Sequence, residues 1–258
     1  MKIFVTRKIP EVGLNKLKAF TDKIIINQEN RNLSHQELIS KAQDVDGILT
    51  MLANDINAKF IESCDNLKCI ANYAVGYNNI DVDKATEKNI VVTNTPGVLT
   101  ETTADLAWAL IMSVTRRVVE SDKYTRAGKF KGWAPELLCG NDVFGKTLGI
   151  VGAGRIGQAT GRRATGFDMD ILYYSRSKKD KFEFETNARK VELEYLLKNS
   201  DIISLHVPLT DETSHLIGSN ELYMMKDSAY LINTARGPVV DEADLVNALK
   251  KNRIAGAG

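Results

Sequence analysis

The amino-acid sequence predicts an α/β protein of two domains, each with a parallel sheet covered by helices on both faces. Short apolar runs alternate with segments of helical spacing along nearly all 258 residues, which is the pattern of βαβ units. One apolar run, Leu148–Val151, leads directly into Gly152-Ala-Gly154-Arg-Ile-Gly157, a glycine turn that opens a helix. A Thr95-Pro96-Gly97 turn separates the first set of alternating segments from the second. We therefore expect one domain at residues 1–98 and another at residues 99–258.

The first domain is expected to contain strands and helices in alternation. Strands are predicted at Met1–Thr6, Ile24–Ile26, Gly47–Met51, Leu67–Asn72 and Ile90–Thr93. Helices are predicted at Glu11–Phe20, from Ser34 to about Ala42, at Ala58–Ser63 and at Val82–Lys88. The second of these helices begins with Ser34-His-Gln-Glu37, a capping-box pattern. His35, in its first turn, is expected to be exposed to solvent.

The second domain is expected to open with one long helix that starts near Leu99 and continues to about Ala127. Its apolar stretch, Ala104–Val114, exceeds what one small sheet needs. Two interpretations remain open: a buried helix that links the domains, or a helix region at 100–127 that also forms a homodimer interface. After an irregular segment, strands are predicted at Leu148–Val151, Ile171–Tyr174, Asp201–His206, Ala229–Asn233 and from Ile254. Helices are predicted from the glycine turn to about Gly166 and at Val191–Lys198, Glu221–Met225 and Glu242–Lys251.

The glycine turn has the spacing and context of a dinucleotide-binding site. Gly152 permits the tight turn, Gly154 lets the backbone approach a pyrophosphate, and Gly157 lets helix and strand pack closely. Arg155 and Ile156 lie at the start of the helix, whose N-terminal N–H groups and partial positive charge favour phosphates. A purely structural turn is the alternative, and the strand–turn–helix–strand context favours dinucleotide binding.

The end of the next predicted strand bears on which nicotinamide cofactor is bound. An NAD site normally has Asp or Glu there, which accepts hydrogen bonds from the adenine ribose. This chain instead has Ser175-Arg176-Ser177, and serine and arginine can bind a 2′-phosphate that a carboxylate would repel. The sequence therefore favours NADP(H) over NAD(H), while Lys178 and Lys179 are best explained as a solvated face.

Composition narrows the remaining classes of partner. The formal charge of +1 offers no electrostatic reason to expect nucleic acid or an anionic membrane. The longest apolar run, Leu106–Met112, is too short to span a bilayer, and the N-terminus reads as a strand and not as a signal peptide. Cys64, Cys69 and Cys139 are odd in number and lack metal-ligand spacing, which suggests a reduced, cytoplasmic compartment and no metal.

Four separated segments resemble those of the D-isomer-specific 2-hydroxyacid dehydrogenases, most closely the glyoxylate/hydroxypyruvate reductases. They are Tyr73-Ala-Val-Gly-Tyr-Asn-Asn-Ile-Asp81, Thr95-Pro-Gly-Val-Leu-Thr-Glu-Thr-Thr-Ala-Asp105, the glycine turn within Gly145-Lys-Thr-Leu-Gly-Ile-Val-Gly, and Ile232-Asn-Thr-Ala-Arg-Gly-Pro-Val-Val-Asp241. The resemblance implies a flavodoxin-like substrate domain, incomplete here, and a Rossmann-type doubly wound domain that lacks its last strands. It also implies a cleft between the domains, in which hydride passes to the keto carbon of a small 2-oxo acid.

The resemblance also assigns site residues. Arg236 matches the catalytic arginine, and its planar, permanently charged fork suits carboxylate and carbonyl oxygens. Val75 and Gly76 match a loop whose backbone N–H groups receive the substrate carboxylate, and Leu52 matches the neighbouring wall. The matching cofactor-groove positions are Thr103, His206, Val207, Pro208, Thr213, Thr234 and Ala235. A surface arginine at a strand end is the alternative explanation for Arg236, and ordinary loop or turn geometry is the alternative for the other positions.

The proton donor is the element that does not match. In the family it is a histidine beside a glutamate, and both follow the segment that ends at Gly258. His35, His206 and His215 do not match the catalytic position. We therefore expect a C-terminally truncated dehydrogenase with little activity. The alternatives are a non-catalytic NAD(P)-binding remnant, a corepressor-like binding protein, and a D-lactate or D-3-phosphoglycerate dehydrogenase. The loop Thr50–Asn54 contains no Arg or Lys for a substrate phosphate, which favours glyoxylate or hydroxypyruvate.

Overall fold

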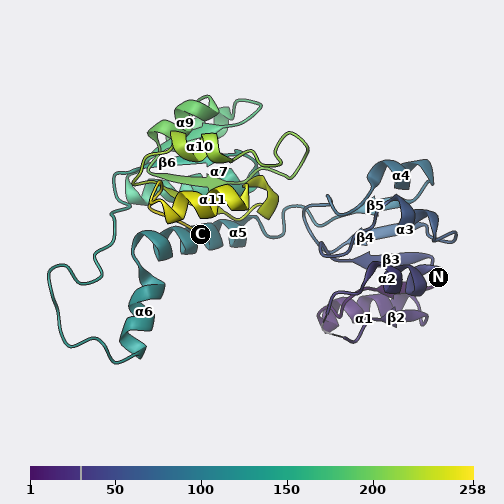
Figure 1. The fold of residues 1–258 in the computed structure, drawn as a ribbon. Helices are drawn as coiled ribbons and strands as arrows, with labels where there is room; N and C mark the ends of the chain where they lie inside the picture. Colours follow the sequence, from purple (N-terminus) through teal and green to yellow (C-terminus); the bar gives the residue numbers. More distant parts are fainter. Residues whose placement is uncertain (30) are drawn as a thin grey trace. The chain divides into compact units, whose positions relative to one another are not determined.

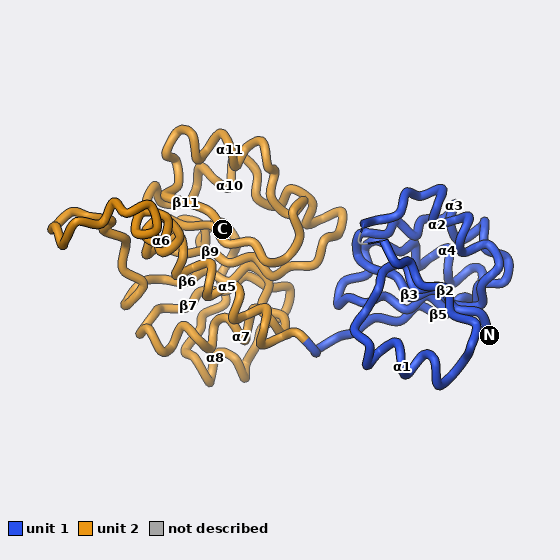
Figure 2. Tube along the Cα trace, turned by 90° about the horizontal axis from the view of Figure 1, so that it is seen from below, with its two compact units in different colours: residues 1–98 blue, residues 99–258 orange. Residues whose placement is uncertain are grey.

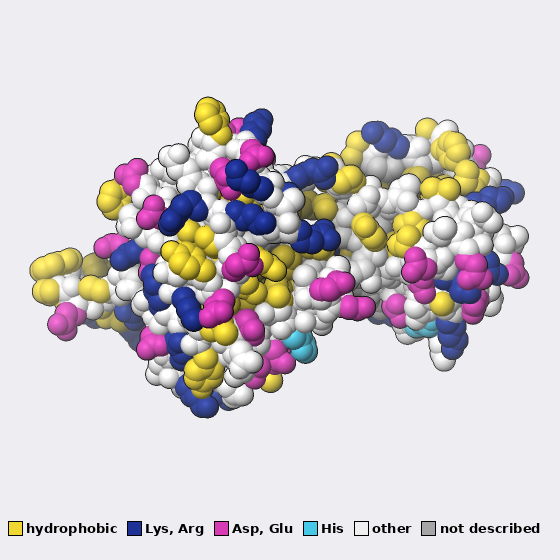
Figure 3. All heavy atoms as spheres, turned by 90° about the horizontal axis from the view of Figure 1, so that it is seen from above, with side chains coloured by type: hydrophobic (Ala, Val, Ile, Leu, Met, Phe, Trp, Pro, Cys, Tyr) yellow, Lys and Arg dark blue, Asp and Glu magenta, His cyan; other side chains and the backbone are white. Residues whose placement is uncertain are grey.

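The computed structural model describes residues 1–29 and 31–258, and the chain forms two compact units, residues 1–98 and 99–258 (Figures 1 and 2). Within the described residues, no helix combines the length and apolar character needed to cross a lipid bilayer. On the face drawn in Figure 3, lysine and arginine side chains are intermixed with aspartate and glutamate on each unit. This mixture is consistent with the formal net charge of +1.

Unit 1 is built on a parallel sheet with the strand order β2-β1-β3-β4-β5, which is the flavodoxin-like order. Its strands are β1 (Ile3–Val5), β2 (Ile24–Ile26), β3 (Gly47–Thr50), β4 (Cys69–Asn72) and β5 (Val91–Thr93). Its helices are α1 (Glu11–Phe20), α2 (His35–Ala42), α3 (Ala58–Glu62) and α4 (Val82–Glu87). The prediction for this half is confirmed in element type and order, with ends that shift by one or two residues.

Helix α2 shows both a confirmed and a wrong expectation. The capping box at Ser34 is present: the Glu37 N–H donates to Ser34 Oγ (3.4 Å), and Glu37 Oε2 accepts from the Ser34 N–H (2.8 Å). His35, by contrast, is not exposed, because both of its ring nitrogens are buried and have no hydrogen-bond partner among the described residues. Its spacing explains this, since His35 precedes the buried Leu38 and Ala42 by three and seven residues and so shares their face.

Unit 2 is built on a second parallel sheet with the strand order β11-β10-β9-β6-β7-β8. Its strands are β6 (Thr147–Val151), β7 (Asp170–Tyr174), β8 (Arg189–Lys190), β9 (Ile202–Leu205), β10 (Tyr230–Asn233) and β11 (Gly256–Ala257). Counted within the unit, this order is 6-5-4-1-2-3, the Rossmann order read from the opposite edge. The strand order reverses between β6 and β9. Ligands of doubly wound sheets bind at this reversal, beside the carboxyl ends of the strands.

The helices of unit 2 lie on both faces of its sheet (Figure 1). They are α5 (Thr100–Thr115), α6 (Val118–Arg126), α7 (Arg155–Ala164), α8 (Asp180–Thr186), α9 (Leu193–Asn199), α10 (Ser219–Met224) and α11 (Glu242–Lys250), with 3-10 turns at Thr165–Phe167 and Gly237–Val239. Helix α8 and strand β8 were not predicted from the sequence. Both are short, and among the residues of α8 only Phe182 and Thr186 are buried, so the apolar pattern is weak.

The single long helix predicted from Leu99 to Ala127 is wrong, because the structure has two helices with a break between them. Arg117 has a φ of 54°, in the left-handed region, and α6 starts after it. The carbonyl of Thr115 accepts the N–H of Asn141 (2.9 Å), so the returning chain takes an acceptor that a continuous helix would have used. Figure 1 shows α6 and the loop after it projecting from the body of unit 2.

Candidate functional site

The glycine turn sits at the strand-order reversal of unit 2, and two of its glycines are required by close contacts. Gly152 has a φ of 98°, and a Cβ there would lie 2.8 Å from the backbone of His206 and Val207. A Cβ on Gly157 would lie 2.2 Å from the carbonyl oxygen of Gly152. Gly154, by contrast, faces open space, and a Cβ added to it would meet no atom within 4 Å. The turn is therefore closed towards the protein and open on the side where a phosphate group would approach.

Helix α7 begins at this turn and presents its N-terminus without a side-chain cap. Gly154 is the N-cap residue, and no side chain among the described residues bonds to the first N–H groups of the helix. Arg155 is exposed and Ile156 is half-buried. Uncapped N–H groups and the helix dipole together form an anion-binding position.

The loop after β7 lies beside the glycine turn, because the N–H of Gly152 donates to the carbonyl of Tyr174 (2.9 Å). Ser175 is half-buried, whereas Arg176 and Ser177 are exposed. No side-chain hydrogen bond or ion pair engages Arg176 within the described part of the chain. Its charge nevertheless contributes to the lowered pKa of Glu212, after the larger effects of hydrogen bonds from Thr210 and the Glu212 backbone.

The two lysines of this loop interact with neighbouring side chains. Lys178 Nζ lies 2.8 Å from Asp180 Oδ1 and 3.2 Å from Glu183 Oε2. Lys179 Nζ donates to Ser177 Oγ (2.7 Å). Arg176 is therefore the loop's cation that stays available for an incoming anion.

The carboxyl end of β9 passes directly under the glycine turn. His206 is half-buried, and its Nε2 lies 2.9 Å from Ser204 Oγ. Burial lowers the pKa of His206 to about 4, so the ring is neutral at neutral pH. Val207 is half-buried beside it. Thr213 fastens the loop that follows, since its Oγ1 donates to the carbonyl of Pro208 (2.6 Å).

The carboxyl end of β10 carries Arg236 and the residues before it. The Thr234 hydroxyl is buried and has no hydrogen-bond partner among the described residues. The Asn233 side chain holds the turn: its Oδ1 accepts from the Ala235 N–H (2.9 Å), and its Nδ2 donates to the Arg236 carbonyl (2.9 Å). Arg236 is half-buried, and its Nη1 donates to the Ala235 carbonyl (2.8 Å). Sequence reasoning missed Asn233, although a polar residue that ends an apolar strand was the signal.

Thr103 lies in the first turn of α5. Its side chain is half-buried, and its N–H donates to the carbonyl of Leu99 (3.0 Å). Helix α5 packs against α7 and β10, and Trp108 Nε1 donates to the carbonyl of Thr160 on α7 (2.9 Å). The start of α5 is therefore fixed to the same helix that begins at the glycine turn.

In unit 1, the loop after β4 presents two backbone N–H groups. The carbonyls of its central residues are held by side chains: Asn94 Nδ2 donates to the Val75 carbonyl (2.8 Å), and Asn72 Nδ2 donates to the Gly76 carbonyl (2.7 Å). The N–H groups of Val75 and Gly76 donate no hydrogen bond within the described residues. A loop with bound carbonyls and free N–H groups suits a carboxylate.

A buried asparagine network, which sequence reasoning did not identify, shapes the neighbouring loop after β3. Asn54 is 3% exposed, and its Oδ1 accepts from Thr6 Oγ1 (2.7 Å), Thr50 Oγ1 (3.1 Å) and the Met51 N–H (2.9 Å). Asn79 Nδ2 donates to the carbonyls of Met51 and Asn54 (3.1 Å each). Leu52 stands at the tip of this loop and is 40% exposed. Asparagines that follow several successive strands were the available signal.

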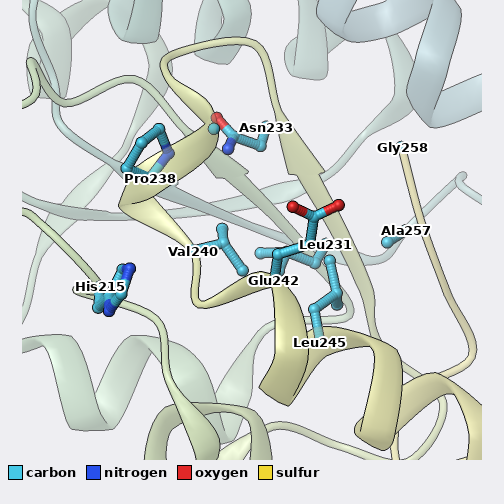
Figure 4. A pocket seen from close by; sticks show the side chains of 10 residues that line it. His215, Leu231, Asn233, Pro238, Val240, Glu242, Leu245, Ala257 and Gly258 are labelled. Carbon is cyan, nitrogen blue, oxygen red and sulfur yellow. The ribbon is translucent and has the colours of Figure 1, made fainter.

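A cavity of about 520 Å³ opens beside α11 and the end of β10 (Figure 4). It is lined by His215, Leu231, Asn233, Gly237, Pro238, Val240, Glu242, Leu245, Ala257 and Gly258. None of these residues belongs to the glycine turn or to the loop after β7, so the cavity is not the phosphate position. His215 is largely exposed and lies 3.4 Å, through Nδ1, from Asp241 Oδ2. The described residues contain no cluster of three potential metal ligands.

A Rossmann-type sheet with an open glycine turn at its strand-order reversal defines a dinucleotide-binding protein. The sequence model of the D-isomer specific 2-hydroxyacid dehydrogenase NAD binding domain matches residues 108–258. The chain belongs to this family of NAD(P)-dependent oxidoreductases that act on 2-hydroxy acids.

Individual relatives agree over the whole chain. A glyoxylate reductase of Korarchaeum cryptofilum (strain OPF8) is 51% identical over 258 residues, which are 100% of this chain and 77% of the relative. A glyoxylate reductase of Thermococcus litoralis is 50% identical over 261 residues, covering 100% of this chain and 78% of the relative. The crystal structure of the TT0316 protein from Thermus thermophilus superposes with a TM-score of 0.91 at 42% identity, covering 100% of this chain and 81% of that one.

Proposed function

We propose that the protein reduces a small 2-oxo acid such as glyoxylate or hydroxypyruvate, with NADP(H) favoured over NAD(H). The observation that carries the reaction class is the pair of unbonded N–H groups at Val75 and Gly76, in a loop whose carbonyls are already held by asparagines. Such a loop is preorganised to receive a substrate carboxylate without rearrangement. The glyoxylate reductases that share about half of the residues of this chain support the choice of substrate.

The residues of unit 2 fit the cofactor. The open space at Gly154 and the uncapped start of α7, with Arg155 and Ile156, would hold the pyrophosphate. The buried, unpartnered Thr234 hydroxyl leaves a hydrogen-bonding group for the bound dinucleotide. Thr103, His206, Val207, Pro208, Thr213 and Ala235 are proposed to line the rest of the groove. When bound, the nicotinamide supplies or accepts the hydride.

Arg236 is the proposed catalytic residue for charge at the keto oxygen. An arginine side chain combines a positive charge with a planar fork of N–H donors, so it can stabilise the oxygen as negative charge develops. The turn that carries it is fixed by the Asn233 amide, which limits the reorganisation required during reaction. Replacing Arg236 with lysine keeps the charge and loses the planar fork, so kcat should fall by roughly a hundred-fold or more.

Substrate size follows from the loop after β3, where Leu52 forms the proposed wall. This loop, residues 50–54, contributes no Arg or Lys to bind a phosphate group. We therefore propose that kcat/KM for glyoxylate and hydroxypyruvate exceeds that for a phosphorylated 2-oxo acid and for pyruvate. Steady-state kinetics with the four substrates would test this, and a preference for the phosphorylated acid would refute it.

The proton donor is not among the histidines of the described chain. His206 is neutral at neutral pH and lies beneath the glycine turn. His215 is exposed and paired with Asp241, and His35 lies in α2 of unit 1 with both ring nitrogens buried. We propose that the 258-residue chain binds cofactor but turns substrate over slowly. Turnover comparable with that of the related glyoxylate reductases, measured on protein of verified mass, would refute this.

The NADP(H) preference has a direct test at the loop after β7. Replacing Arg176 with alanine should weaken NADPH binding about ten-fold and leave NADH binding unchanged, because only the 2′-phosphate gains a charge-assisted contact there. Replacing Ser175 with aspartate should reverse the preference. Lys181→Ala is the matched control, since that side chain is 88% exposed on the outside of α8. Titration by fluorescence would measure both affinities, and tighter NADH binding by the unmodified protein would refute the proposal.

The exposed apolar side chains of α5 and α6 bear on the oligomeric state. Helix α5 buries Ala104, Ala107 and Ile111 inside unit 2, while Leu106 on its other side and Val118 on α6 are about half exposed. We propose that the 100–127 region forms a homodimer through these exposed apolar positions.

The free state of all three cysteines supports a reducing cytoplasmic location.

A further inference from the structure

The loop proposed to receive the 2′-phosphate, residues 175–179, is held by a hydrogen bond at each end. At its start, the carbonyl of Tyr174 accepts the N–H of Gly152 (2.9 Å). At its end, the N–H of Lys179 donates to the hydroxyl of Tyr173 (2.8 Å). A side chain of the strand that the loop leaves therefore fixes the point where the loop ends.

Tyr173 is placed for this contact by the core of unit 2. The residue is fully buried, and its ring meets Phe182 edge-on with centroids 5.7 Å apart. Its hydroxyl donates to Glu183 Oε1 (2.7 Å) while it accepts from Lys179. This hydrogen bond from Tyr173 is the leading reason that the pKa of the Glu183 carboxyl lies below its usual value. Phenylalanine would fill the same core space, so the contribution of the hydroxyl is to the loop and not to packing.

The same contacts determine which cation of the loop remains available. Glu183, held by Tyr173, binds Lys178 (3.2 Å), and Lys179 donates to Ser177. Arg176, which precedes these residues in the loop, has no side-chain partner within the described residues. The Tyr173–Glu183 pair thus holds Lys178 and the end of the loop, and leaves the exposed Arg176 available to an incoming anion.

We infer that Tyr173 is a positioning residue for cofactor selection: its hydroxyl, braced by Glu183, holds the 175–179 loop in the shape that binds a ribose 2′-phosphate. The inference rests on the proposed NADP(H) preference and adds to it a determinant outside the Ser175-Arg176-Ser177 segment. It requires that loss of one buried hydroxyl weaken binding of the 2′-phosphate specifically, with binding of the rest of the nucleotide unchanged.

The experiment compares 2′,5′-ADP with 5′-AMP, two probes that differ by the 2′-phosphate and need no catalysis. Calorimetric titration of the whole chain would give both dissociation constants for the unmodified protein and for Tyr173→Phe. We expect about two- to ten-fold weaker binding of 2′,5′-ADP by Tyr173→Phe, the range of one net hydrogen bond, and unchanged binding of 5′-AMP. The matched control is Tyr230→Phe, which removes another buried hydroxyl that accepts from Asn141 Nδ2 (2.6 Å) at the opposite end of the strands.

The outcomes separate the inference from the proposed function. If the unmodified protein binds both probes equally, the NADP(H) proposal fails and the inference with it. If the unmodified protein prefers 2′,5′-ADP and Tyr173→Phe loses affinity for both probes equally or for neither, the inference alone is overturned. Should Tyr173→Phe not fold, amide hydrogen exchange of the unmodified protein decides the point. The Lys179 amide is expected to be protected, and fast exchange there would contradict the loop anchor.

Discussion

Single residues at the glycine turn combine a backbone requirement with a packing requirement. Gly157 is the clearest case, because a Cβ there would lie 2.2 Å from the Gly152 carbonyl oxygen, which has little freedom to move. We predict that Gly157→Ala lowers the free energy of unfolding by about 1–3 kcal/mol, the usual cost of overpacking. It should also weaken NADPH binding, because helix α7 must move away from the turn.

The control for this change is Gly166→Ala, since Gly166 has no atom within 4 Å of a Cβ position and no positive φ. Urea unfolding would measure the stability of both variants. Equal stability of Gly157→Ala and Gly166→Ala would show that the close packing at the turn does not contribute to the free energy of unfolding.

His206 gives a pH dependence whose direction follows from its burial. Its pKa is about 4 in the folded protein, against an ordinary value of 6.5. Below pH 6.5 the unfolded chain takes up a proton that the folded chain does not, so this residue lowers stability as the pH falls from 6.5 to 4. Its contribution is constant above about pH 7.

The measurement is a set of unfolding curves between about pH 4 and pH 8 for the unmodified protein and for His206→Gln. We expect the stability difference between the two to stay constant above about pH 7 and to shift in favour of the variant below about pH 6.5. A difference that does not change with pH would mean that His206 titrates normally.

Among the elements, the loops that carry the proposed substrate groups are held by hydrogen bonds of asparagine side chains. Asn54 satisfies three donors at once. We predict that Asn54→Ala lowers the free energy of unfolding by roughly 3 kcal/mol, because these buried donors lose their acceptor. Asn66→Ala, at an exposed position, should change it by less than about 0.5 kcal/mol. Calorimetric melting would compare them, and similar losses would argue against the network.

Elements with a clear apolar period were predictable, and elements defined by their partners were not. The strands of both sheets other than β8, and the capping box of α2, follow from local spacing and were confirmed. The break at Arg117 was not predictable, because two consecutive arginines contain no helix breaker and the competing donor, Asn141, is distant in sequence. Strand β8 is two residues long and is formed by pairing with β7, so it has no local signature either.

The site itself was predictable only in part. The glycine spacing indicates a dinucleotide-binding turn, because such a turn requires glycines at fixed spacing and these can be recognised in the sequence. The roles of Asn54, Asn72 and Asn233 depend on which carbonyls and N–H groups the fold brings to their amides. Buried hydrogen-bond partners far apart in sequence leave no periodic pattern to read.

For the whole molecule, the exposed apolar side chains of the projecting helix α6 predict a homodimer. Val118 and Val119 are 50% and 54% exposed, and no residue of α6 is buried. We predict that Val118→Asp combined with Val119→Asp converts a homodimer into a monomer, because a charge in an apolar interface is costly. Light scattering after size-exclusion chromatography would measure the mass. A monomeric unmodified protein would refute the dimer, and Lys123→Asp on the same helix is the charge control.

One of the two tryptophans is buried and the other is exposed, so their intrinsic fluorescence can be told apart. Trp108 is 7% exposed and stacks on Phe167 with centroids 4.8 Å apart. Its indole N–H donates a hydrogen bond to α7, the helix that begins at the glycine turn. Trp133 is 84% exposed in the projecting loop after α6. Emission from Trp108 should therefore be blue-shifted and shielded from acrylamide, and emission from Trp133 red-shifted and readily quenched. In a Trp133→Phe variant the remaining signal would follow the cofactor-binding unit alone.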